Sequence, residues 1–470
     1  MSGSTFRTNP GACPLSKKCG GCQLQNMTYE RQLKWKQARV EILLRGFGKV
    51  DRIIGMENPY HYRNKVQAAF GRTRNGKIIS GVYQSGSHRI VCVDSCMIED
   101  ETADSIIVDI RNMLPKFKMT VYDEDRRTGF LRHVLVKRGF STNEVMVVLV
   151  AADNIFPQKK NFTRVLLEKH PEISTVILNI NPRSTNLVLG DREEVIYGEG
   201  YIRDTLCGLT FAISSRSFYQ INPVQTEKLY GIATEYAGLS PDSTVIDAYC
   251  GIGTIGLVAA KTAGSVIGVE LNPDAVRDAI ANAGNNGIKN IRFYCDDAGD
   301  FMNAMKDENM HADVVFMDPP RSGSTGKFIS SLLKIAPKKI VYISCNPETL
   351  ARDLRKITKG NYKVTRITPV DMFPHTNHVE TVCLLSKLSE AKHHISVQVD
   401  MDELDLTAAE STATYEEIQE WVQAKYGFHV THLNIAKTKR KCGIIERQNY
   451  NLPKNENSRS PETPKEKEEA

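Results

Sequence analysis

Residues 245–261 read VIDAYCGIGTIGLVAAK, a pattern typical of a β-strand, a glycine loop and an α-helix in succession. Gly251, Gly253 and Gly256 satisfy the spacing GxGxxG of nucleoside-binding loops. Glu270 lies at the end of the next apolar segment, where a carboxylate can bind both hydroxyls of a ribose. The stretch therefore predicts a site for an adenosine cofactor, and it fits NAD and S-adenosylmethionine equally well.

The alternation of apolar strands and helical stretches around this loop extends from about residue 204 to residue 388. It predicts a Rossmann-like, doubly wound α/β domain with a parallel sheet. Ligands of such sheets bind at the carboxyl ends of the strands, so residues that follow strands are candidates for the active site. The predicted strands are TVIDAYCG, SVIGVEL, NIRFYCDD, DVVFMDPP, KIVYIS and HVETVCLL.

The rest of the chain differs in composition from this domain. Short β-branched runs separated by Gly, Asn and Asp predict a mostly antiparallel β domain with one helix near residues 162–170. We also expect an amphipathic, cation-rich helix at 29–44 and a helix at 414–427. The predicted divisions are a cysteine-cluster segment over 1–55, the β domain over 56–203, the α/β domain over 204–388, a C-terminal extension over 389–450 and a disordered tail over 451–470.

The chain has 470 residues and a formal net charge of +6, which permits a nucleic-acid partner without requiring one. It shows neither a membrane-spanning stretch nor the apolar core of a signal peptide, so we expect a cytoplasmic protein with no membrane partner. Eleven cysteines in a reducing compartment indicate metal ligands, catalytic thiols or buried side chains rather than disulfides. We expect the protein to be a monomer.

Asp318 follows a predicted strand and is itself followed by Pro319, Pro320 and Arg321 rather than by the start of a helix. A carboxylate stiffened by prolines suits the active-site loop of a methyltransferase better than a nicotinamide site. Methyltransferases that act on amino nitrogens carry a similar loop with an aromatic residue where this chain has Arg321. The arginine therefore favours a carbon atom as the methyl acceptor.

Cys345 lies between the strand KIVYIS and a helix that begins near Pro347. This position places the thiol in the ligand crevice, and a helix amino terminus lowers the pKa of a thiol toward the reactive thiolate. A small buried side chain explains the position equally well.

Carbon 5 of uracil becomes nucleophilic toward a methyl sulfonium once a thiolate has added to carbon 6. A general base must then remove the hydrogen of carbon 5 before the thiol can leave. Cys345 is the candidate nucleophile, and Glu380, at the start of a predicted strand, is the candidate base. His375 and His378 in the preceding loop are rival bases, and an exposed strand residue is the structural alternative for Glu380.

Cys13, Cys19 and Cys22 have the spacing C-x5-C-x2-C of a metal-ligand set. A fourth thiolate must come from elsewhere in the chain. Cys96 lies in a predicted turn and is a better candidate than Cys92, for which the strand alternation predicts a core position. Four thiolates can bind either zinc or an iron–sulfur cluster.

The segment YHYRNKVQAAFGRTRNGK at 60–77 interleaves cations with aromatic residues. Cations neutralise phosphates and tyrosines stack on unpaired bases when proteins bind single-stranded RNA. A β-hairpin with a charged outer face explains the pattern equally well. The candidate contacts are Arg63, Lys65, Arg72 and Arg74 for phosphates and Tyr60 and Tyr62 for bases.

With these motifs the chain resembles the RNA uracil-C5 methyltransferase family, and most closely the bacterial enzymes that act on 23S ribosomal RNA. The matching motifs, SFYQIN at 217–222, DAYCGIGTIGL, GVELNPDAV, DPPRSG, SCNPETLARDL and DMFPHTNHVE, together cover most of residues 13–388. The resemblance implies Cys345 as the nucleophile and Glu380 as the base. The further residues that it implies are Gln220, Tyr249, Glu270 and Asp318 around S-adenosylmethionine, Phe218 near the flipped base, and Cys13, Cys19, Cys22 and Cys96 as ligands of a [4Fe–4S] cluster.

The chain departs from this family at both ends. Members that act on ribosomal RNA often begin with a small β-barrel RNA-binding domain, and only twelve residues precede Cys13. We therefore expect RNA contacts from the β domain, the helix at 29–44 or the C-terminal extension. The helix of that extension and its basic segment at 437–441 form either an added RNA-binding module or a solvated charged surface.

The expected reaction is therefore methylation of carbon 5 of a uridine in 23S ribosomal RNA. One alternative is the same chemistry on transfer RNA. The others are an NAD-linked iron–sulfur oxidoreductase and a non-catalytic RNA-binding protein.

Overall fold

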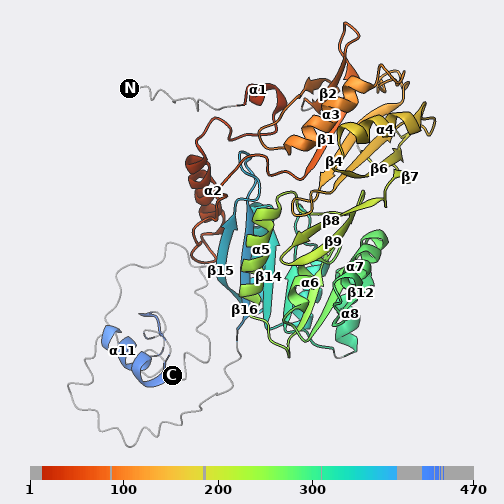
Figure 1. The fold of residues 1–470 in the computed structure, drawn as a ribbon. Helices are drawn as coiled ribbons and strands as arrows, with labels where there is room; N and C mark the ends of the chain where they lie inside the picture. Colours follow the sequence, from red (N-terminus) through yellow and green to blue (C-terminus); the bar gives the residue numbers. More distant parts are fainter. Residues whose placement is uncertain are drawn as a thin grey trace, which may run out of the picture. The chain divides into compact units, whose positions relative to one another are not determined.

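The computed structural model of the chain describes residues 13–84, 87–183, 187–308, 310–388, 415–427, 429–432, 435 and 438. The chain divides into two compact units, Met1–Leu388 and Ser389–Ala470. The first unit contains two seven-stranded sheets and one two-stranded sheet (Figure 1). The finer divisions that the sequence suggests stay predictions.

The first sheet is mostly antiparallel, as the sequence predicts. Its order is β3-β2-β1-β4-β5-β6-β7, and β5 runs parallel to β6 while the other described neighbours are antiparallel. The strands are β1 (Lys65–Arg72), β2 (Ile78–Tyr83), β3 (Ile90–Cys92), β4 (Leu131–Arg138), β5 (Val145–Ala151), β6 (Ile173–Ile180) and β7 (Arg192–Tyr197).

Two helices share a hydrophobic core with this sheet, α3 (Glu101–Met113) and α4 (Lys159–Lys169). The sequence predicts α4 but not α3, because α3 contains the β-branched run of Ile106, Ile107 and Val108. Asp100 caps α3 by accepting a hydrogen bond from the N–H of Ala103 at 3.0 Å. Burial of one apolar face, together with this cap, outweighs the local strand preference.

The second sheet has the order β12-β11-β10-β13-β14-β16-β15. The strands from β10 to β14 are parallel to their neighbours, whereas β16 is antiparallel to both β14 and β15. The expected all-parallel sheet is therefore a mixed one. The strands are β10 (Thr244–Ala248), β11 (Ser265–Glu270), β12 (Ile291–Cys295), β13 (Val314–Met317), β14 (Lys339–Ser344), β15 (Tyr362–Val370) and β16 (Glu380–Lys387).

Helices cover both faces of the second sheet, as a doubly wound fold requires. Val245 of β10 enters one core with Leu229 and Leu257, whereas the next residue, Ile246, enters the other core with Met302. The remaining elements of this unit are α1 (Ser16–Cys19), α2 (Tyr29–Leu44), α5 (Pro223–Ala237), α6 (Thr254–Ala260), α7 (Pro273–Asn285), α8 (Ala298–Asp307), α9 (Gly326–Ile335), α10 (Pro347–Ile357), the 3-10 helix η1 (Thr358–Gly360), and the strands β8 (Tyr201–Leu206) and β9 (Leu209–Ser214) of the two-stranded sheet.

The second unit contains α11 (Tyr415–Tyr426), close to the helix predicted at 414–427. Val422 of α11 packs with Val430 and Ile435 in a small core. The predicted tail over 451–470 and almost all of the basic segment at 437–441 lie outside the described residues. In the part of the chain that the structure describes, no helix has the length and apolar character needed to cross a membrane.

Candidate active site

The glycine loop between β10 and α6 has the conformation that its sequence predicts. Gly253 has φ of +84°, and a Cβ there would lie 3.0 Å from the ring of Phe293. A Cβ at Gly256 would lie 2.9 Å from Oδ2 of Asp247, which instead accepts the N–H of Gly256 at 2.7 Å. The glycines thus let the loop and α6 lie directly against β10.

Three predicted cofactor residues lie at one level of the second sheet. Ala248 pairs with Val269 on one side and with Met317 on the other. The residues that follow, Tyr249, Glu270 and Asp318, are therefore neighbours at the carboxyl edge of the sheet. Gly251 and Gly253, the cofactor candidates of the glycine loop, adjoin them in the sequence.

The Glu270 carboxylate is partly exposed at this edge and is held in a fixed direction. It accepts hydrogen bonds from the N–H of Gly251 at 3.1 Å and from the N–H of Asn272 at 2.8 Å. Such a carboxylate can accept the two hydroxyls of a ribose. The observed residues therefore fit the adenosine part of S-adenosylmethionine.

Gln220 and Phe218 precede α5 in the segment SFYQIN. The carbonyl of Gln220 accepts a hydrogen bond from Nδ2 of Asn64 at 3.1 Å, which joins this segment to the start of β1. Phe218 is 65% exposed, so its ring can stack on a base.

Cys345 and Glu380 are brought together by the antiparallel pairing of β14 with β16. Ser344 pairs with Thr381, and the next residues in that register are Cys345 and Glu380. Glu380 is buried, so its alternative as an exposed strand residue is wrong. The position of β16 therefore places a carboxylate beside the thiol.

Burial, with neighbouring negative charge as a second cause, raises the pKa of both members of this pair. Burial, with the charge of Asp318, raises the pKa of Glu380 well above its usual range. Burial also raises the pKa of the Cys345 thiol to about 11, and the charges of Glu380 and Asp318 add to this effect. Arg321 opposes both shifts.

The expected lowering of the Cys345 pKa by the helix amino terminus is therefore wrong. The helix α10 does begin at Pro347, and the side chain of Asn346 caps it by accepting from the N–H of Glu348 at 3.1 Å. Burial and two carboxylates outweigh the helix, because both disfavour the charged thiolate.

The sequence offered no role for Asp247, which the structure places beneath the site. Burial raises the pKa of Asp247 to about 8, the N–H of Gly256 opposes this, and the charges of Asp318 and Glu270 add to it. A carboxylate inside an apolar strand was the signal that could have identified it.

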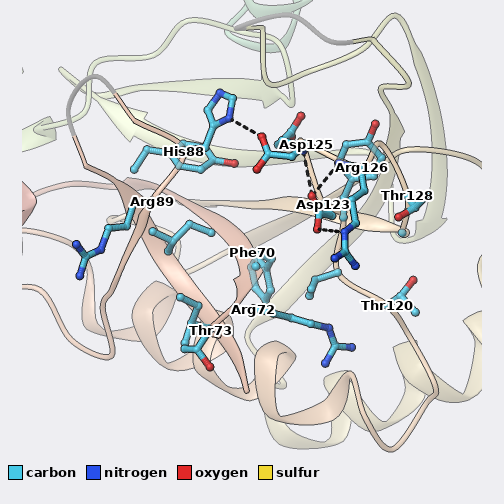
Figure 2. Close-up of a pocket in the computed structure, with 18 of the residues that line it drawn as sticks. Phe70, Arg72, Thr73, His88, Arg89, Thr120, Asp123, Asp125, Arg126 and Thr128 are labelled. Carbon is cyan, nitrogen blue, oxygen red and sulfur yellow. Dashed lines mark hydrogen bonds and ion pairs between the residues drawn. The ribbon is translucent and has the colours of Figure 1, made fainter. Parts of the chain in front are cut away.

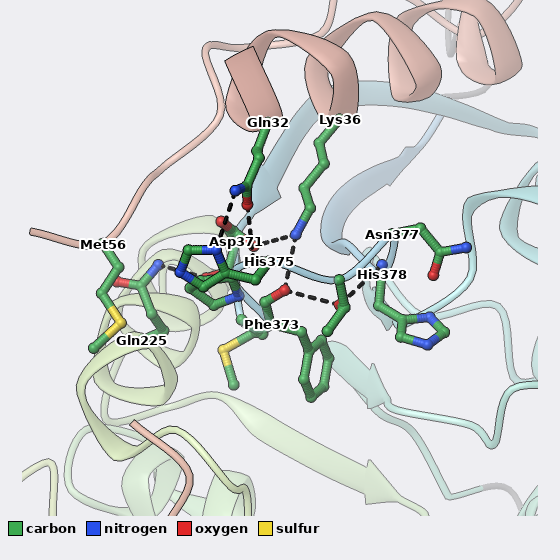
Figure 3. A network of polar contacts seen from close by, with 12 residues as sticks. Gln32, Lys36, Met56, Gln225, Asp371, Phe373, His375, Asn377 and His378 are labelled. Carbon is green, nitrogen blue, oxygen red and sulfur yellow. Dashed lines mark hydrogen bonds and ion pairs between the residues drawn. The ribbon is translucent and has the colours of Figure 1, made fainter. Parts of the chain in front are cut away.

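The loop from Asp371 to His378, which leads into Glu380, is fastened to α2 (Figure 3). Lys36 and Asp371 form an ion pair of 2.5 Å in which both side chains are 0% exposed. Nζ of Lys36 also donates to the carbonyl of Phe373 at 2.9 Å. The opposite oxygen of Asp371 accepts the hydroxyl of Tyr29 at 2.9 Å.

The rival base His375 belongs to the same network. The backbone N–H of His375 donates to Oε1 of Gln32 at 2.8 Å, and its ring Nδ1 lies 3.1 Å from Nε2 of Gln32. Its ring stacks on Tyr60 at 5.0 Å between centroids, and burial lowers its pKa. These contacts give His375 a structural role in holding the loop.

Positive charge surrounds the other rival base, His378. Burial lowers its pKa, and four cations add to the effect. Arg321 is exposed and has no ion pair with a described residue. The cations, which come from several elements, are Arg321, Lys36, Arg39 and Arg63.

The predicted RNA contacts of segment 60–77 separate into two groups. Arg63 and Lys65 lie near the SFYQIN segment, where burial and the charge of Arg63 lower the pKa of Lys65. Arg72 and Arg74 are exposed at the opposite end of β1. Tyr62 is only 1% exposed and donates its hydroxyl to the carbonyl of Pro374 at 2.9 Å, so the hypothesis that it stacks on a base is wrong.

The structure brings the N-terminal thiols within electrostatic range of one another. Burial raises the pKa of Cys22 to about 11, and the charges of Cys19 and Cys13 add to this effect. Burial raises the pKa of Cys96 to about 12, with a further contribution from Glu99. Among the described residues, no three or more His, Cys, Asp or Glu side chains are arranged as a metal site.

Cys92 is exposed, so its predicted core position is wrong. It lies on the short strand β3, and its Sγ is 3.5 Å from the guanidinium of Arg111. None of the described cysteines forms a disulfide.

The sequence of most of the first unit matches a known family. A family model described as tRNA (uracil-5-)-methyltransferase matches residues 28–388. The chain belongs to this family. It is an S-adenosylmethionine-dependent RNA (uracil-5-)-methyltransferase, which sets aside the oxidoreductase and the non-catalytic alternatives.

Relatives and solved structures agree with this assignment. The chain is 44% identical over 378 residues to an uncharacterized RNA methyltransferase of Halalkalibacterium halodurans, covering 79% of this chain and 82% of the relative. Identity and coverage are the same for an uncharacterized RNA methyltransferase of Oceanobacillus iheyensis. The crystal structure of Pyrococcus abyssi tRNA (uracil-54, C5)-methyltransferase in complex with S-adenosyl-L-homocysteine has a TM-score of 0.65 and 28% identity, and the match covers 78% of this chain and 85% of that one.

Proposed function

We propose that this methyltransferase modifies carbon 5 of a uridine in 23S ribosomal RNA, with Cys345 as nucleophile and Glu380 as base. The observation that carries the proposal is the register of β14 and β16, which places these two side chains next to each other at the ligand edge of the sheet. The reaction needs both groups on one base, and the pair meets that need.

The residues of the chain have distinct tasks in the proposed mechanism. The thiol proton of Cys345 leaves to solvent, and the cation of Arg321 stabilises the thiolate that remains. The sulfur then bonds to carbon 6 of uracil, and the electrons of the 5,6 double bond move toward the carbonyl at carbon 4. Carbon 5 gains the nucleophilic character that methylation requires.

Glu380 completes the reaction by removing the hydrogen of carbon 5 as a proton. The electrons of that C–H bond re-form the double bond, and the bond between carbon 6 and sulfur breaks to return Cys345 as a thiolate. A buried carboxylate with a raised pKa is a stronger proton acceptor than an exposed one, once it is ionised.

Glu270, Tyr249, Asp318, Gln220 and the glycines of the loop are the residues that we propose to hold S-adenosylmethionine. When bound, this cofactor supplies the methyl group together with a positive sulfonium charge. The support is the fixed direction of the Glu270 carboxylate and the common level of the three strand ends.

The proposed ribosomal substrate depends on the sequence motifs that resemble enzymes of 23S ribosomal RNA. The similarity to the Pyrococcus abyssi tRNA (uracil-54, C5)-methyltransferase favours transfer RNA as the second candidate. On either RNA we propose that Phe218 stacks near the flipped uracil and that Arg63 and Lys65 bind the adjoining phosphates.

Release of tritium from RNA labelled at carbon 5 of uridine tests both parts of the proposal. We expect release that depends on S-adenosylmethionine, from 23S ribosomal RNA and not from transfer RNA. Release from transfer RNA alone would replace the substrate and keep the chemistry. Methyl transfer without tritium release would overturn methylation at carbon 5.

We also propose that Cys13, Cys19, Cys22 and Cys96 hold a [4Fe–4S] cluster after rearrangement of their side chains. The support is the C-x5-C-x2-C spacing of the first three cysteines and the partly exposed, unbridged state of all four thiols. Protein purified without oxygen should contain about four irons and four sulfides. A protein that folds and methylates RNA with neither iron nor sulfide would contradict this proposal.

A further inference from the structure

A cavity of about 1120 Å³ lies in the first sheet, apart from the catalytic residues (Figure 2). We call it the hairpin cavity, because it lies between the β1–β2 hairpin, the segment before β3 and the segment 120–129. It is large enough for a nucleotide, since pockets for small ligands measure about 300–1,000 Å³. The site proposed above for the uracil uses none of its lining residues.

The hairpin cavity has more positive charge than its own carboxylates neutralise. Arg72, Arg74 and Arg89 line it, and none of them forms an ion pair with a described residue. Among the described residues, the guanidinium of Arg72 donates only to the carbonyl of Gly76, at 2.9 Å. The positive charges of these three arginines are therefore available to a ligand.

The acidic residues of the cavity already have partners. Glu124 forms a bidentate ion pair with Arg132, with distances of 2.8 and 2.9 Å. Asp123 accepts the backbone N–H groups of Asp125 and Arg126, each at 3.0 Å. Oδ2 of Asp123 also lies 3.9 Å from Nε of Arg126, and Oδ1 of the third carboxylate, Asp125, lies 3.5 Å from Nδ1 of His88. Within the described residues, none of these carboxylates forms an ion pair with the three free arginines.

The cavity also offers an aromatic ring and an unused hydroxyl. Tyr83 is half-buried in the lining, and its ring lies 6.1 Å from His133 and 6.3 Å from His88 between centroids. Oγ1 of Thr73 is buried and has no hydrogen-bond partner among the described residues. Uncompensated arginines beside an aromatic ring are the features with which proteins bind single-stranded RNA.

The strand β1 connects this cavity to the proposed active site. At its start, Asn64 bonds to the SFYQIN segment, and at its end Arg72 lines the cavity. The eight residues from Lys65 to Arg72 span about 23 Å at about 3.3 Å per residue. A ligand in the cavity is therefore too far away to be the uracil that reacts with Cys345.

We propose that the hairpin cavity is a second RNA-binding site, which binds phosphates and an unpaired base of the substrate outside the loop that carries the target uridine. The proposal depends on the proposed function, because it takes the same RNA as substrate. In this proposal the cavity determines how tightly the protein binds its RNA and which RNA it selects. The reaction itself takes place at the carboxyl edge of the second sheet.

The test measures how the full-length protein binds two RNAs by fluorescence anisotropy. The long RNA is a 23S fragment that the wild-type protein methylates, and the short RNA is the target hairpin alone. The variant Arg74→Ala/Arg89→Ala removes two exposed cations of the cavity. The control Lys289→Ala/Arg292→Ala removes two exposed cations at the outer edge of the second sheet.

We expect the cavity variant to bind the long RNA about tenfold more weakly and the short RNA as tightly as wild type. For the long RNA, the plot of log binding constant against log salt concentration should become shallower by about 1.4. Each phosphate contact with a single strand contributes about 0.7 to that slope, and the variant loses two contacts. Arg74→Lys/Arg89→Lys should restore most of the binding. The control should change neither RNA more than twofold.

Equal weakening on both RNAs, or no weakening on the long one, would overturn the second site. A wild-type protein that neither binds nor methylates any of these RNAs would instead overturn the proposed substrate. Turnover at saturating long RNA should stay within twofold of wild type in the cavity variant. A large loss of that turnover would also contradict the division of tasks.

Discussion

Replacement of Lys36 by methionine should both destabilise the protein and slow methylation. Lys36 and Asp371 are fully buried, so the substitution leaves a carboxylate in the core that has lost its cation. Among the described side chains, only the hydroxyl of Tyr29 would still donate to that carboxylate. Breaking a buried pair in this way costs about 3–5 kcal/mol.

The same substitution removes the bond from Lys36 to the carbonyl of Phe373. The loop that contains this carbonyl leads directly into Glu380, so its release moves the general base. A displacement of about 1 Å can lower the rate about a hundredfold. We therefore expect a large fall in kcat and a small change in KM for S-adenosylmethionine.

Urea denaturation followed by circular dichroism, together with steady-state methylation, measures both effects. Lys34→Met on the same helix is the matched control, because Lys34 pairs with Glu30 at the surface and such pairs contribute at most about 1 kcal/mol. The double variant Lys36→Met/Asp371→Asn should recover much of the stability, since it no longer buries an unpaired charge. A loss below about 1 kcal/mol in Lys36→Met, with unchanged kcat, would refute the role of this pair.

Three further predictions concern buried groups that carry or lose a proton. Alkylation of Cys345 by iodoacetamide should accelerate about tenfold per pH unit between pH 7 and 10, because its pKa is about 11, and Arg321→Ala should be slower at every pH; a flat profile would contradict this. Glu380→Gln should form the covalent RNA adduct but lower tritium release at least about a hundredfold, and normal release would assign the base elsewhere. Burial, assisted by the charge of Lys65, lowers the pKa of Lys137 to about 7 in the folded protein. Above that pH the unfolded chain therefore binds more protons than the folded protein does. Wild type should gain stability between pH 7 and about 10 by up to about 1.4 kcal/mol per unit, as measured by urea unfolding, and Lys137→Met should show no such gain.

The strands that carry the cofactor residues are predictable from the sequence because they are buried on both faces. Val245 and Ile246 enter different cores, and such strands are continuous apolar runs. The edge strand β15 escaped prediction since it is polar on one side and contains Pro369. Proline lacks an N–H and is tolerated in a strand at the edge of a sheet, which is where β15 lies.

The active-site pairing was only partly predictable. Cys345 and Glu380 can each be assigned to a strand end from local pattern, but their contact depends on the insertion of an antiparallel β16 beside β14. The raised pKa of Cys345 was not predictable, because it arises from burial in the fold and from the charges of Glu380 and Asp318, which are distant in the sequence. The sequence around Cys345 shows the helix that would lower the pKa of the thiol, but not the two carboxylates that raise it.

The network below the loop was not predictable for a similar reason. On its helix Lys36 has the spacing of an ordinary cation, and only the fold places Asp371, 335 residues away, against it. A buried lysine requires such a partner, since an isolated buried charge is too costly. The sequence shows the two charges but not their pairing.

The most direct test of the central claim is a trapping assay with 23S ribosomal RNA fragments that contain 5-fluorouridine. Fluorine cannot leave carbon 5 as a proton does, so the bond between Cys345 and carbon 6 should persist after methyl transfer. We predict a protein–RNA adduct that survives denaturation, requires S-adenosylmethionine and is absent from Cys345→Ala. An adduct of equal yield in Cys345→Ala, with RNA and cofactor binding intact, would contradict the account.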